Sequence, residues 1–256
     1  MTDPQLAWSE DGTPDGAPLI MGSSLGTTRD MWIPGLDAIT GFRIIRFDHL
    51  GHGESAVPDG PYSMEQLGGA VLELMDHLGI ERAHYAGLSL GGAVGQWLAI
   101  HHPERIDRLA LLATAAYFPD PDSWRDRAAL VRREGTEGFA DNAMTRWFND
   151  RFRAERPDEV AQWRAMVAGT PAEGYAGCCE ALAEYDVRDD LGKITSPTLA
   201  IAGADDPSTS PETMQIIVDG IPGSRLETIE DAAHLVNVPH PDRVGGLVTD
   251  HLRGQL

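Results

Sequence analysis

Short apolar runs alternate along the chain with segments in which apolar residues recur at helical spacing. The runs that predict β-strands are residues 5–8, 17–21, 42–48, 83–88, 106–113, 198–202 and 225–229. A helix is expected from Met64 to Leu78, with Ser63 as its N-cap and Gly79 at its C-terminal end. This alternation predicts an α/β fold with a mostly parallel, twisted sheet flanked by helices.

The middle of the chain departs from this alternation. Between residues 119 and 190 no segment has convincing strand character, whereas helical spacing recurs at residues 124–133, 139–152, 157–167 and 174–182. Strand, turn and helix follow one another again from Thr198, so the helical segment interrupts the sheet. We therefore expect an α/β core of residues 1–118 and 191–256, with an inserted helical lid of residues 119–190 over the C-terminal edge of the sheet.

The composition restricts the partners of the protein. Among 256 residues, 20 are basic and 40 acidic, which gives a formal charge of −20. Such a charge repels phosphate backbones and anionic membranes. No apolar run approaches the length of about 18 residues that a membrane helix needs, and the first residues lack the positive and apolar regions of a signal peptide. We expect a cytoplasmic protein that binds neither nucleic acid nor membranes. Its oligomeric state is left open.

Two cysteines and a pair of histidines are of residue types that can ligate a metal. Cys178 and Cys179 are adjacent, too close for an ordinary disulfide and without the spacing of a metal site, so we expect free, buried thiols. His49 and His52 follow an expected strand, but no third ligand stands at a suitable spacing. A loop in which Asp48 and both histidines bond to the backbone is favoured over a zinc site. We expect neither a metal nor a cofactor.

The strongest chemical signal is the sequence Gly87-Leu88-Ser89-Leu90-Gly91-Gly92, where an apolar run passes directly into a segment with helical spacing. This context is typical of a nucleophile elbow, in which a serine lies on a sharp turn of strained backbone. Gly87 and Gly91 lack the Cβ atoms that would collide with the neighbouring strand and helix. Ser89 is therefore predicted to be a nucleophile, with an incidental serine in a glycine-rich turn as the alternative.

Backbone N–H groups near Ser89 are expected to form an oxyanion hole. The N–H of Leu90 opens the following helix, at the positive end of its dipole. The second donor of such a site commonly comes from the loop after an early strand, here residues 22–28, and we assign it to Leu25. Because Ser23-Ser24 replaces the usual His-Gly, the donor could be a neighbour of Leu25. A plain tight turn is the alternative for this loop.

An acid and a histidine follow Ser89 in the order that completes a catalytic triad. The strand ending at Gly203 leads into a loop with Asp205 and Asp206, and a later strand is followed by His234. We predict that Asp206 orients His234, since adjacent side chains of an extended loop cannot both face one imidazole. His234 would then take the proton of Ser89 as it attacks an acyl carbon. Asp205 remains the alternative acid, and His240 the alternative base.

Several stretches of the chain together resemble the 3-oxoadipate enol-lactonases of the α/β-hydrolase superfamily. They are residues 23–32, 46–55, 87–98, 146–148, 174–179 and 233–238. The elbow and the triad order are shared by the whole superfamily, whereas Arg-Trp-Phe at 146–148 and Gly-Tyr-Ala-Gly-Cys-Cys at 174–179 are narrower signals. The chain departs from the family at Ser23, where Asn is frequent, and at Leu90, where Met is frequent. These differences concern the oxyanion loop more than the reaction.

The resemblance implies an α/β-hydrolase fold and a carboxylic-ester hydrolase with a Ser-Asp-His triad. The implied reaction opens the ring of 3-oxoadipate enol-lactone to give 3-oxoadipate, in aromatic breakdown through the β-ketoadipate pathway. The substrate is a small anionic lactone, and the global charge of −20 opposes it. We therefore predict a local cation, Arg146, as the group that binds the carboxylate, with Trp147 covering the lactone ring. A surface ion pair for Arg146 and core packing for Trp147 are the alternative interpretation.

Other functions are compatible with parts of this pattern. Dehalogenases and epoxide hydrolases of this fold need Asp at the elbow, and dienelactone hydrolases need Cys, so Ser89 disfavours them. A carboxylesterase, a C–C bond hydrolase or an acyltransferase would keep the same triad and differ in the lid. A non-catalytic small-molecule receptor built on the same scaffold is a further alternative, which a turnover assay would distinguish.

Overall fold

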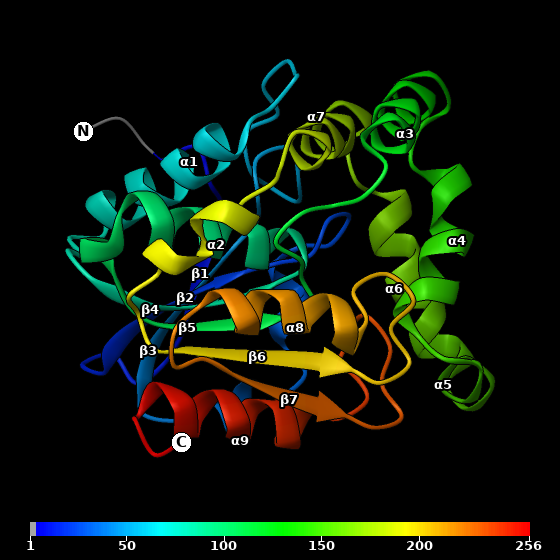
Figure 1. Ribbon diagram of the computed structural model, residues 1–256. Helices are drawn as coiled ribbons and strands as arrows, with labels where there is room; N and C mark the ends of the chain where they lie inside the picture. Colours follow the sequence, from blue (N-terminus) through cyan, green and yellow to red (C-terminus); the bar gives the residue numbers. More distant parts are fainter. Residues whose placement is uncertain (1–3) are drawn as a thin grey trace.

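The computed structural model describes residues 4–256 and places a twisted sheet between layers of helices (Figure 1). Within these residues, seven strands pair in the order β1-β3-β2-β4-β5-β6-β7. Only β1 is antiparallel to its neighbour; the other pairs are parallel. The strands are β1 (Trp8–Gly12), β2 (Ala17–Gly22), β3 (Phe42–Phe47), β4 (Ala83–Leu88), β5 (Ile106–Leu112), β6 (Thr198–Gly203) and β7 (Arg225–Ile229). The expected fold class is confirmed.

One expected strand was wrong. The first strand is Trp8–Gly12, not residues 5–8, and it pairs at the sheet edge with Phe47 to Arg43 of β3. Its outer positions are polar, and Asp11 accepts a hydrogen bond at 2.7 Å from Arg46 Nε. An edge strand held by the ladder and an ion pair carries little apolar pattern, so hydrophobicity alone did not mark it.

Neighbouring residues along a strand pack into two separate cores, one on each face of the sheet. Ile20 packs with α1 (Met64–His77), α2 (Leu90–His101) and α8 (Pro211–Gly220), whereas Leu19 and Met21 pack with α9 (Pro241–Leu252) on the opposite face. This alternation follows from the period of two in a strand, and because both faces are covered the central strands are apolar throughout. Figure 1 shows α8 and α9 on opposite sides of β6 and β7.

The helical segment between β5 and β6 lies beyond the carboxyl ends of β6 and β7 (Figure 1). Its helices are α3 (Pro121–Glu134), α4 (Glu137–Trp147), α5 (Asp150–Glu155), α6 (Pro157–Ala168) and α7 (Ala172–Ala183). The single helix expected over residues 139–152 was wrong, since α4 ends at Trp147 and α5 begins at Asp150. Asn149 separates them by capping α5, where its side chain accepts the N–H of Phe152 at 2.9 Å.

Two sets of contacts tie this segment together. At its base, Tyr117 and Asp186 form an isolated antiparallel bridge, so the chain leaves and re-enters the sheet layer at one place. Further out, Arg132 of α3 bonds the carboxylates of Glu173 and Glu180 on α7. Residues 1–3 of the expected core lie outside the described residues. In the rest of the chain, no helix is both long and apolar enough to span a membrane.

Short 3₁₀ turns complete the structure. They are η1 (Arg29–Trp32), η2 (Leu36–Ala38), η3 (Pro103–Arg105) and η4 (Arg188–Lys193). The first of them matters for the site because Arg29–Trp32 follows directly on the loop at the end of β2. Met31 and Trp32 are buried on the α9 side of the sheet and hold that loop against the core.

Candidate active site

Ser89 lies at the turn between β4 and α2 in a conformation that few non-glycine residues adopt. Its φ of 55° and ψ of −112° lie outside the common regions, at a cost of about 1–3 kcal/mol. The turn is held by the N–H of Ser89, which donates to Leu112 O at 2.9 Å, and by Thr114 Oγ1, which donates to Ser89 O at 2.7 Å. The surrounding β-strand thus over-determines a strained position, as a nucleophile elbow requires.

The two glycines flanking Ser89 make close backbone contacts. A Cβ on Gly87 would lie 2.3 Å from Gly91 O, and one on Gly91 would lie 2.3 Å from Gly22 O. Both distances are far shorter than a van der Waals contact, so β4, α2 and β2 approach one another only because these positions lack side chains. The glycine pattern therefore serves the turn geometry itself.

Asp206 and His234 meet in the loops after β6 and β7. His234 Nδ1 and Asp206 Oδ2 are 2.8 Å apart, and both side chains are almost completely buried. Asp206 also accepts hydrogen bonds from Thr209 Oγ1 at 2.6 Å and from the N–H of Ser208 at 2.7 Å. With Nδ1–H directed at the carboxylate, Nε2 is left as the proton acceptor of the ring.

The electrostatics of this pair favour an ionised acid. Burial alone opposes ionisation, but the charge of His234 and the hydrogen bonds from His234, Thr209 and Ser208 outweigh it and lower the pKa of Asp206. The carboxylate is thereby kept as a hydrogen-bond acceptor for the imidazole.

The alternative residues lie elsewhere. Asp205 accepts a hydrogen bond at 2.8 Å from Asn149 Nδ2 at the exposed junction of α4 and α5. Adjacent aspartates thus face different partners, as expected for neighbouring side chains of an extended segment. His240 stands at the N-terminus of α9 and does not line the cavity that contains Ser89 and His234.

Two backbone N–H groups near Ser89 are free to bind an oxyanion. In the described chain, neither Leu25 N–H nor Leu90 N–H donates a hydrogen bond. In the loop after β2 the neighbouring N–H groups are occupied: Ser24 donates to Met31 Sδ and Gly26 to His52 Nε2. Leu25 also lines the cavity, whereas Leu90 begins α2, whose positive dipole end adds to its donor strength.

His49 and His52 position the same loop. His52 Nε2 accepts the N–H of Gly26 at 2.9 Å, so its proton resides on Nδ1, which lies 3.1 Å from Leu50 O. His49 Nε2 lies 3.0 Å from Ser23 O. Burial lowers the pKa of His52 to about 4 and that of His49 to about 3, so both rings are neutral. As expected, these histidines bond backbone groups.

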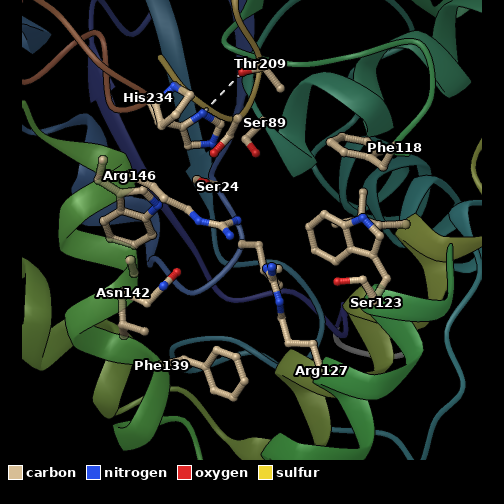
Figure 2. A pocket seen from close by; sticks show the side chains of 18 of the residues that line it. Ser24, Ser89, Phe118, Ser123, Arg127, Phe139, Asn142, Arg146, Thr209 and His234 are labelled. Carbon is tan, nitrogen blue, oxygen red and sulfur yellow. Dashed lines mark hydrogen bonds between the residues drawn. The ribbon is translucent and has the colours of Figure 1, made fainter. Parts of the chain in front are cut away.

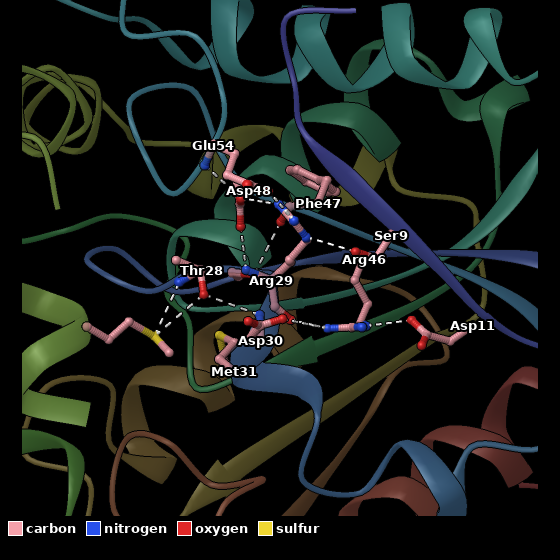
Figure 3. A network of polar contacts seen from close by, with 12 residues as sticks. Ser9, Asp11, Thr28, Arg29, Asp30, Met31, Arg46, Phe47, Asp48 and Glu54 are labelled. Carbon is pink, nitrogen blue, oxygen red and sulfur yellow. Dashed lines mark hydrogen bonds and ion pairs between the residues drawn. The ribbon is translucent and has the colours of Figure 1, made fainter. Parts of the chain in front are cut away.

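An ion-pair network fixes the far end of the loop (Figure 3). Arg29 donates its N–H to Asp48 Oδ1 at 2.6 Å, and its guanidinium pairs with Asp48 and Glu54. Arg46 Nη1 donates to Arg29 O at 2.9 Å and joins this loop to Asp11 on the edge strand. Loop 23–28 is therefore fastened at both ends, which keeps the Leu25 N–H in place.

Ser89 and His234 lie at the floor of a cavity of about 350 Å³ (Figure 2). The walls come from the helical segment, and the cavity lies between that segment and the sheet edge. Arg146 and Trp147 both line it, from the end of α4; Arg146 is exposed, and Trp147 is buried. The backbone of these two residues also contacts the triad loop, because His234 N–H points at Arg146 O at 3.4 Å and Leu235 N–H at Trp147 O at 3.3 Å.

Two residues that line the cavity were not predicted from the sequence. Thr209 bonds the Asp206 carboxylate and lies 3.2 Å from His234 Nδ1; its spacing of three residues after an aspartate is a local signal for such a bond. Arg127 enters from α3 and lies over Trp124, three residues earlier on the same helix face. An arginine beside an aromatic residue on a lid helix was the available signal.

The structure offers no cluster of metal-ligating side chains in its described part. Within residues 4–256 no group of three or more His, Cys, Asp or Glu side chains could hold a metal ion. Cys178 and Cys179 are buried, unpaired thiols on α7, and burial raises the pKa of Cys179 to about 12. Neither cysteine lines the cavity.

Comparison with known proteins places this arrangement in a family. Residues 17–241 match the family model of the alpha/beta hydrolase fold. The chain belongs to the α/β-hydrolase fold family. It is 43% identical over 93% of its length to 3-oxoadipate enol-lactonase 2 of Acinetobacter baylyi, of which it covers 90%.

Solved structures agree with this assignment. The enol-lactonase from Burkholderia xenovorans LB400 has a TM-score of 0.94 at 38% identity, with 97% of this chain and 96% of that chain covered. A thermophilic esterase from Thermogutta terrifontis, solved with malate bound, has a TM-score of 0.92 at 31% identity, with coverage of 97% and 93%. The resemblance to enol-lactonases is confirmed, and this α/β hydrolase is a carboxylic-ester hydrolase.

Proposed function

We propose that this α/β hydrolase opens the ring of 3-oxoadipate enol-lactone to give 3-oxoadipate, through an acyl-enzyme on Ser89. The observation that carries the proposal is the cavity in which Ser89, the His234–Asp206 pair and two cationic lid side chains converge. Similarity to an enol-lactonase at 43% identity over 93% of the chain supports the choice of lactone and of the β-ketoadipate pathway.

In the acylation step, Ser89 Oγ attacks the lactone carbonyl carbon while His234 Nε2 takes the hydroxyl proton. The N–H groups of Leu25 and Leu90 stabilise the negative oxygen of the tetrahedral intermediate, and Asp206 stabilises the imidazolium. When the intermediate collapses, the ring C–O bond breaks and His234 returns its proton to the departing enol oxygen. The released enol becomes the ketone by tautomerisation.

In the deacylation step, His234 activates a water molecule, which attacks the ester carbon of the acyl-Ser89. The same two N–H donors receive the oxyanion, and Ser89 leaves with the proton that His234 took from water. The new acid ionises, so the product carries two carboxylates where the substrate carried one. The proposed reaction steps use no cofactor.

The substrate carboxylate is bound in this proposal by Arg146, with Trp147 against the lactone ring. Arg146 lines the cavity and has no carboxylate partner in residues 4–256, which is unusual in so acidic a chain. Partial burial and the charge of Arg127 lower the pKa of Arg146, and the opposite charge of a bound anion would raise it again. A related esterase was solved with malate, a dicarboxylate, bound.

Residues 119–190 act as the lid in this proposal, over a core of residues 1–118 and 191–256. Their helices supply the walls that enclose the substrate, whereas the core supplies Ser89, Asp206 and His234. A cytoplasmic location and the absence of nucleic-acid partners remain expectations from the charge and the sequence.

Turnover of the enol-lactone tests the proposal directly. Ring opening removes the conjugated enol ester, so the ultraviolet absorbance of the purified lactone should fall rapidly with enzyme and slowly without it. A Ser89→Ala protein, shown by circular dichroism to be folded, serves as the control and should be inactive. Absence of turnover by the wild-type protein would contradict the proposal.

A carboxylesterase is the second candidate, because the chain is 31% identical to the Thermogutta terrifontis esterase. The two functions differ in what the lid must recognise. An enol-lactonase should have a kcat/KM for the anionic lactone well above that for a neutral ester of similar size, and an esterase should show the reverse. The ratio of the two kcat/KM values therefore decides between them.

A further inference from the structure

Arg127 and Arg146 enter one cavity from different lid helices, α3 and α4. Figure 2 shows both side chains reaching toward the middle of the cavity, below Ser89 and His234 in that view. Burial and the charge of Arg127 both lower the pKa of Arg146, so the two side chains lie close enough to interact. Two cations directed at one space repel each other, and an anion bound between them would offset this repulsion.

The chain offers abundant carboxylates for pairing, yet these two arginines have none. Acidic residues outnumber basic ones by 40 to 20, and most arginines of the described chain form ion pairs, including Arg125 and Arg132 on the same helix as Arg127. Within residues 4–256, no ion pair includes Arg127 or Arg146. Their N–H donors are therefore available to a ligand.

Aromatic rings hold Arg127 in its place. Its guanidinium carbon lies 4.4 Å from the centre of the Trp124 ring and 5.9 Å from that of Phe139. Contacts of this kind fix the plane of the guanidinium through its face and leave the N–H groups at its edge able to form hydrogen bonds. The Tyr175 hydroxyl, whose pKa is raised by burial, lines the same cavity close to both positive charges.

We propose that Arg127 and Arg146 form a single two-arginine site for the carboxylate that does not react, and that Arg127 makes the hydrolase specific for substrates carrying that charge. The proposal rests on the proposed lactone hydrolysis and extends it to a residue outside the family motifs. Small dicarboxylates fit the same chemistry, with one carboxylate at the two arginines and the other at the Leu25 and Leu90 N–H groups. They are therefore expected to bind as inhibitors.

Binding of adipate, a dicarboxylate without an ester bond, tests the site separately from catalysis. Isothermal titration should show saturable binding to the wild-type protein, and adipamide, its uncharged analogue, should bind at least on the order of tenfold more weakly. In Arg127→Met, which keeps the apolar stem against Trp124, the Kd for adipate should rise on the order of tenfold to a hundredfold. Arg133→Met is the matched control, because Arg133 lies on the exposed side of the same helix and pairs with Glu134.

The kinetics of the same variants give a second readout. Arg127→Met should raise KM for the anionic lactone on the order of tenfold and leave kcat/KM for a neutral ester unchanged, and Arg127→Lys should recover part of the loss. Equal adipate affinity in Arg127→Met and Arg133→Met, or equal binding of adipate and adipamide, would overturn the two-arginine site. Adipate binding that depends on Arg127 in a protein without lactonase activity would retain the site and reject the proposed reaction.

Discussion

The core side and the lid side of the cavity hold their polar groups in different ways. On the core side, Asp206 accepts several hydrogen bonds, and His234 is anchored through Asp206. On the lid side, Arg127 and Arg146 reach into the cavity with no ion-pair partner in residues 4–256, and Arg127 is held by ring faces. The core groups bond one another, whereas the two arginines have N–H groups that the proposed site uses to bind a carboxylate.

This difference separates chemistry from recognition. In the proposed mechanism, Ser89, His234 and Asp206 need a fixed geometry through both steps, and hydrogen bonds from protein partners to these groups reduce reorganisation. A binding site needs the opposite, because a donor already paired within the protein has little to offer a ligand. If the proposed site is correct, Arg127 and Arg146, which form no ion pair within residues 4–256, therefore indicate the charge of the substrate.

The largest effect is expected from breaking the core side at Ser89. Ser89→Ala should lower kcat on the order of 10⁴-fold or more, because only the oxyanion donors and substrate binding would remain. Ser123→Ala is a suitable control, since Ser123 lines the lid side of the same cavity and is assigned no chemical step. Comparable activity of the two variants, both folded, would exclude an acyl-Ser89 intermediate.

The next effect distinguishes the two adjacent aspartates. Asp206→Asn should lower kcat on the order of 10³-fold, because the amide cannot stabilise the imidazolium or hold the Nδ1–H tautomer. Asp205→Asn keeps a group that can bond Asn149 at an exposed position and should stay near wild-type activity. Steady-state kinetics of both variants measure the difference; a larger loss at Asp205 would reverse the assignment.

On the lid side, Arg146→Ala should act on binding of the charged substrate and leave the chemical step intact. We expect a higher KM for the anionic lactone, equivalent to about 1.5–3 kcal/mol for the loss of a charge-assisted hydrogen bond, and little change for a neutral ester. Equal losses on both substrates would mean that Arg146 supports the triad loop through its backbone neighbours instead of binding the carboxylate.

The smallest effect on activity, but a distinct one on stability, concerns the loop that carries Leu25. Because the pKa of His52 falls from 6.5 in the unfolded chain to about 4 in the native state, the unfolded state binds more protons between these values. The stabilisation is present above about pH 6.5 and is lost as the pH falls toward about 4. At about pH 5 the loss amounts to about 2 kcal/mol for this group.

Urea unfolding at a series of pH values measures this effect. His52→Gln, which can still bond Gly26 N–H and Leu50 O, should show a free energy of unfolding that depends less on pH in this range than that of the wild-type protein. His101→Gln, at an exposed end of α2, controls for the substitution itself. Parallel pH curves for wild type and His52→Gln would show that this histidine does not remain neutral in the native state.

Much of the core could be predicted from the sequence because its signals are local. Buried parallel strands are continuous apolar runs, so β2 to β7 were expected close to their observed bounds. The turn around Ser89 was recognisable because the backbone contacts require glycine at positions 87 and 91. His234 was recognisable because it follows a predicted strand and comes after the acid loop in the chain. The edge strand β1 and the break at Asn149 were missed, since a sheet ladder and a side-chain cap decide them.

The sequence by itself determined the alternation of strands and helices, the helical insertion and the residue types Ser, Asp and His of the predicted triad. These features could be predicted because the strand period, the helix period and the glycines of a turn are patterns among neighbouring residues. The sequence favoured Asp206 over Asp205 and Leu25 over its neighbours, and the tertiary structure places Asp206 against His234 and leaves the N–H of Leu25 free while its neighbours are bonded. The tertiary structure alone placed Arg127 opposite Arg146, from a helix with no motif of its own. The two side chains come together because α3 and α4 pack over the edge of the sheet, and no pattern among neighbouring residues predicts how close they lie.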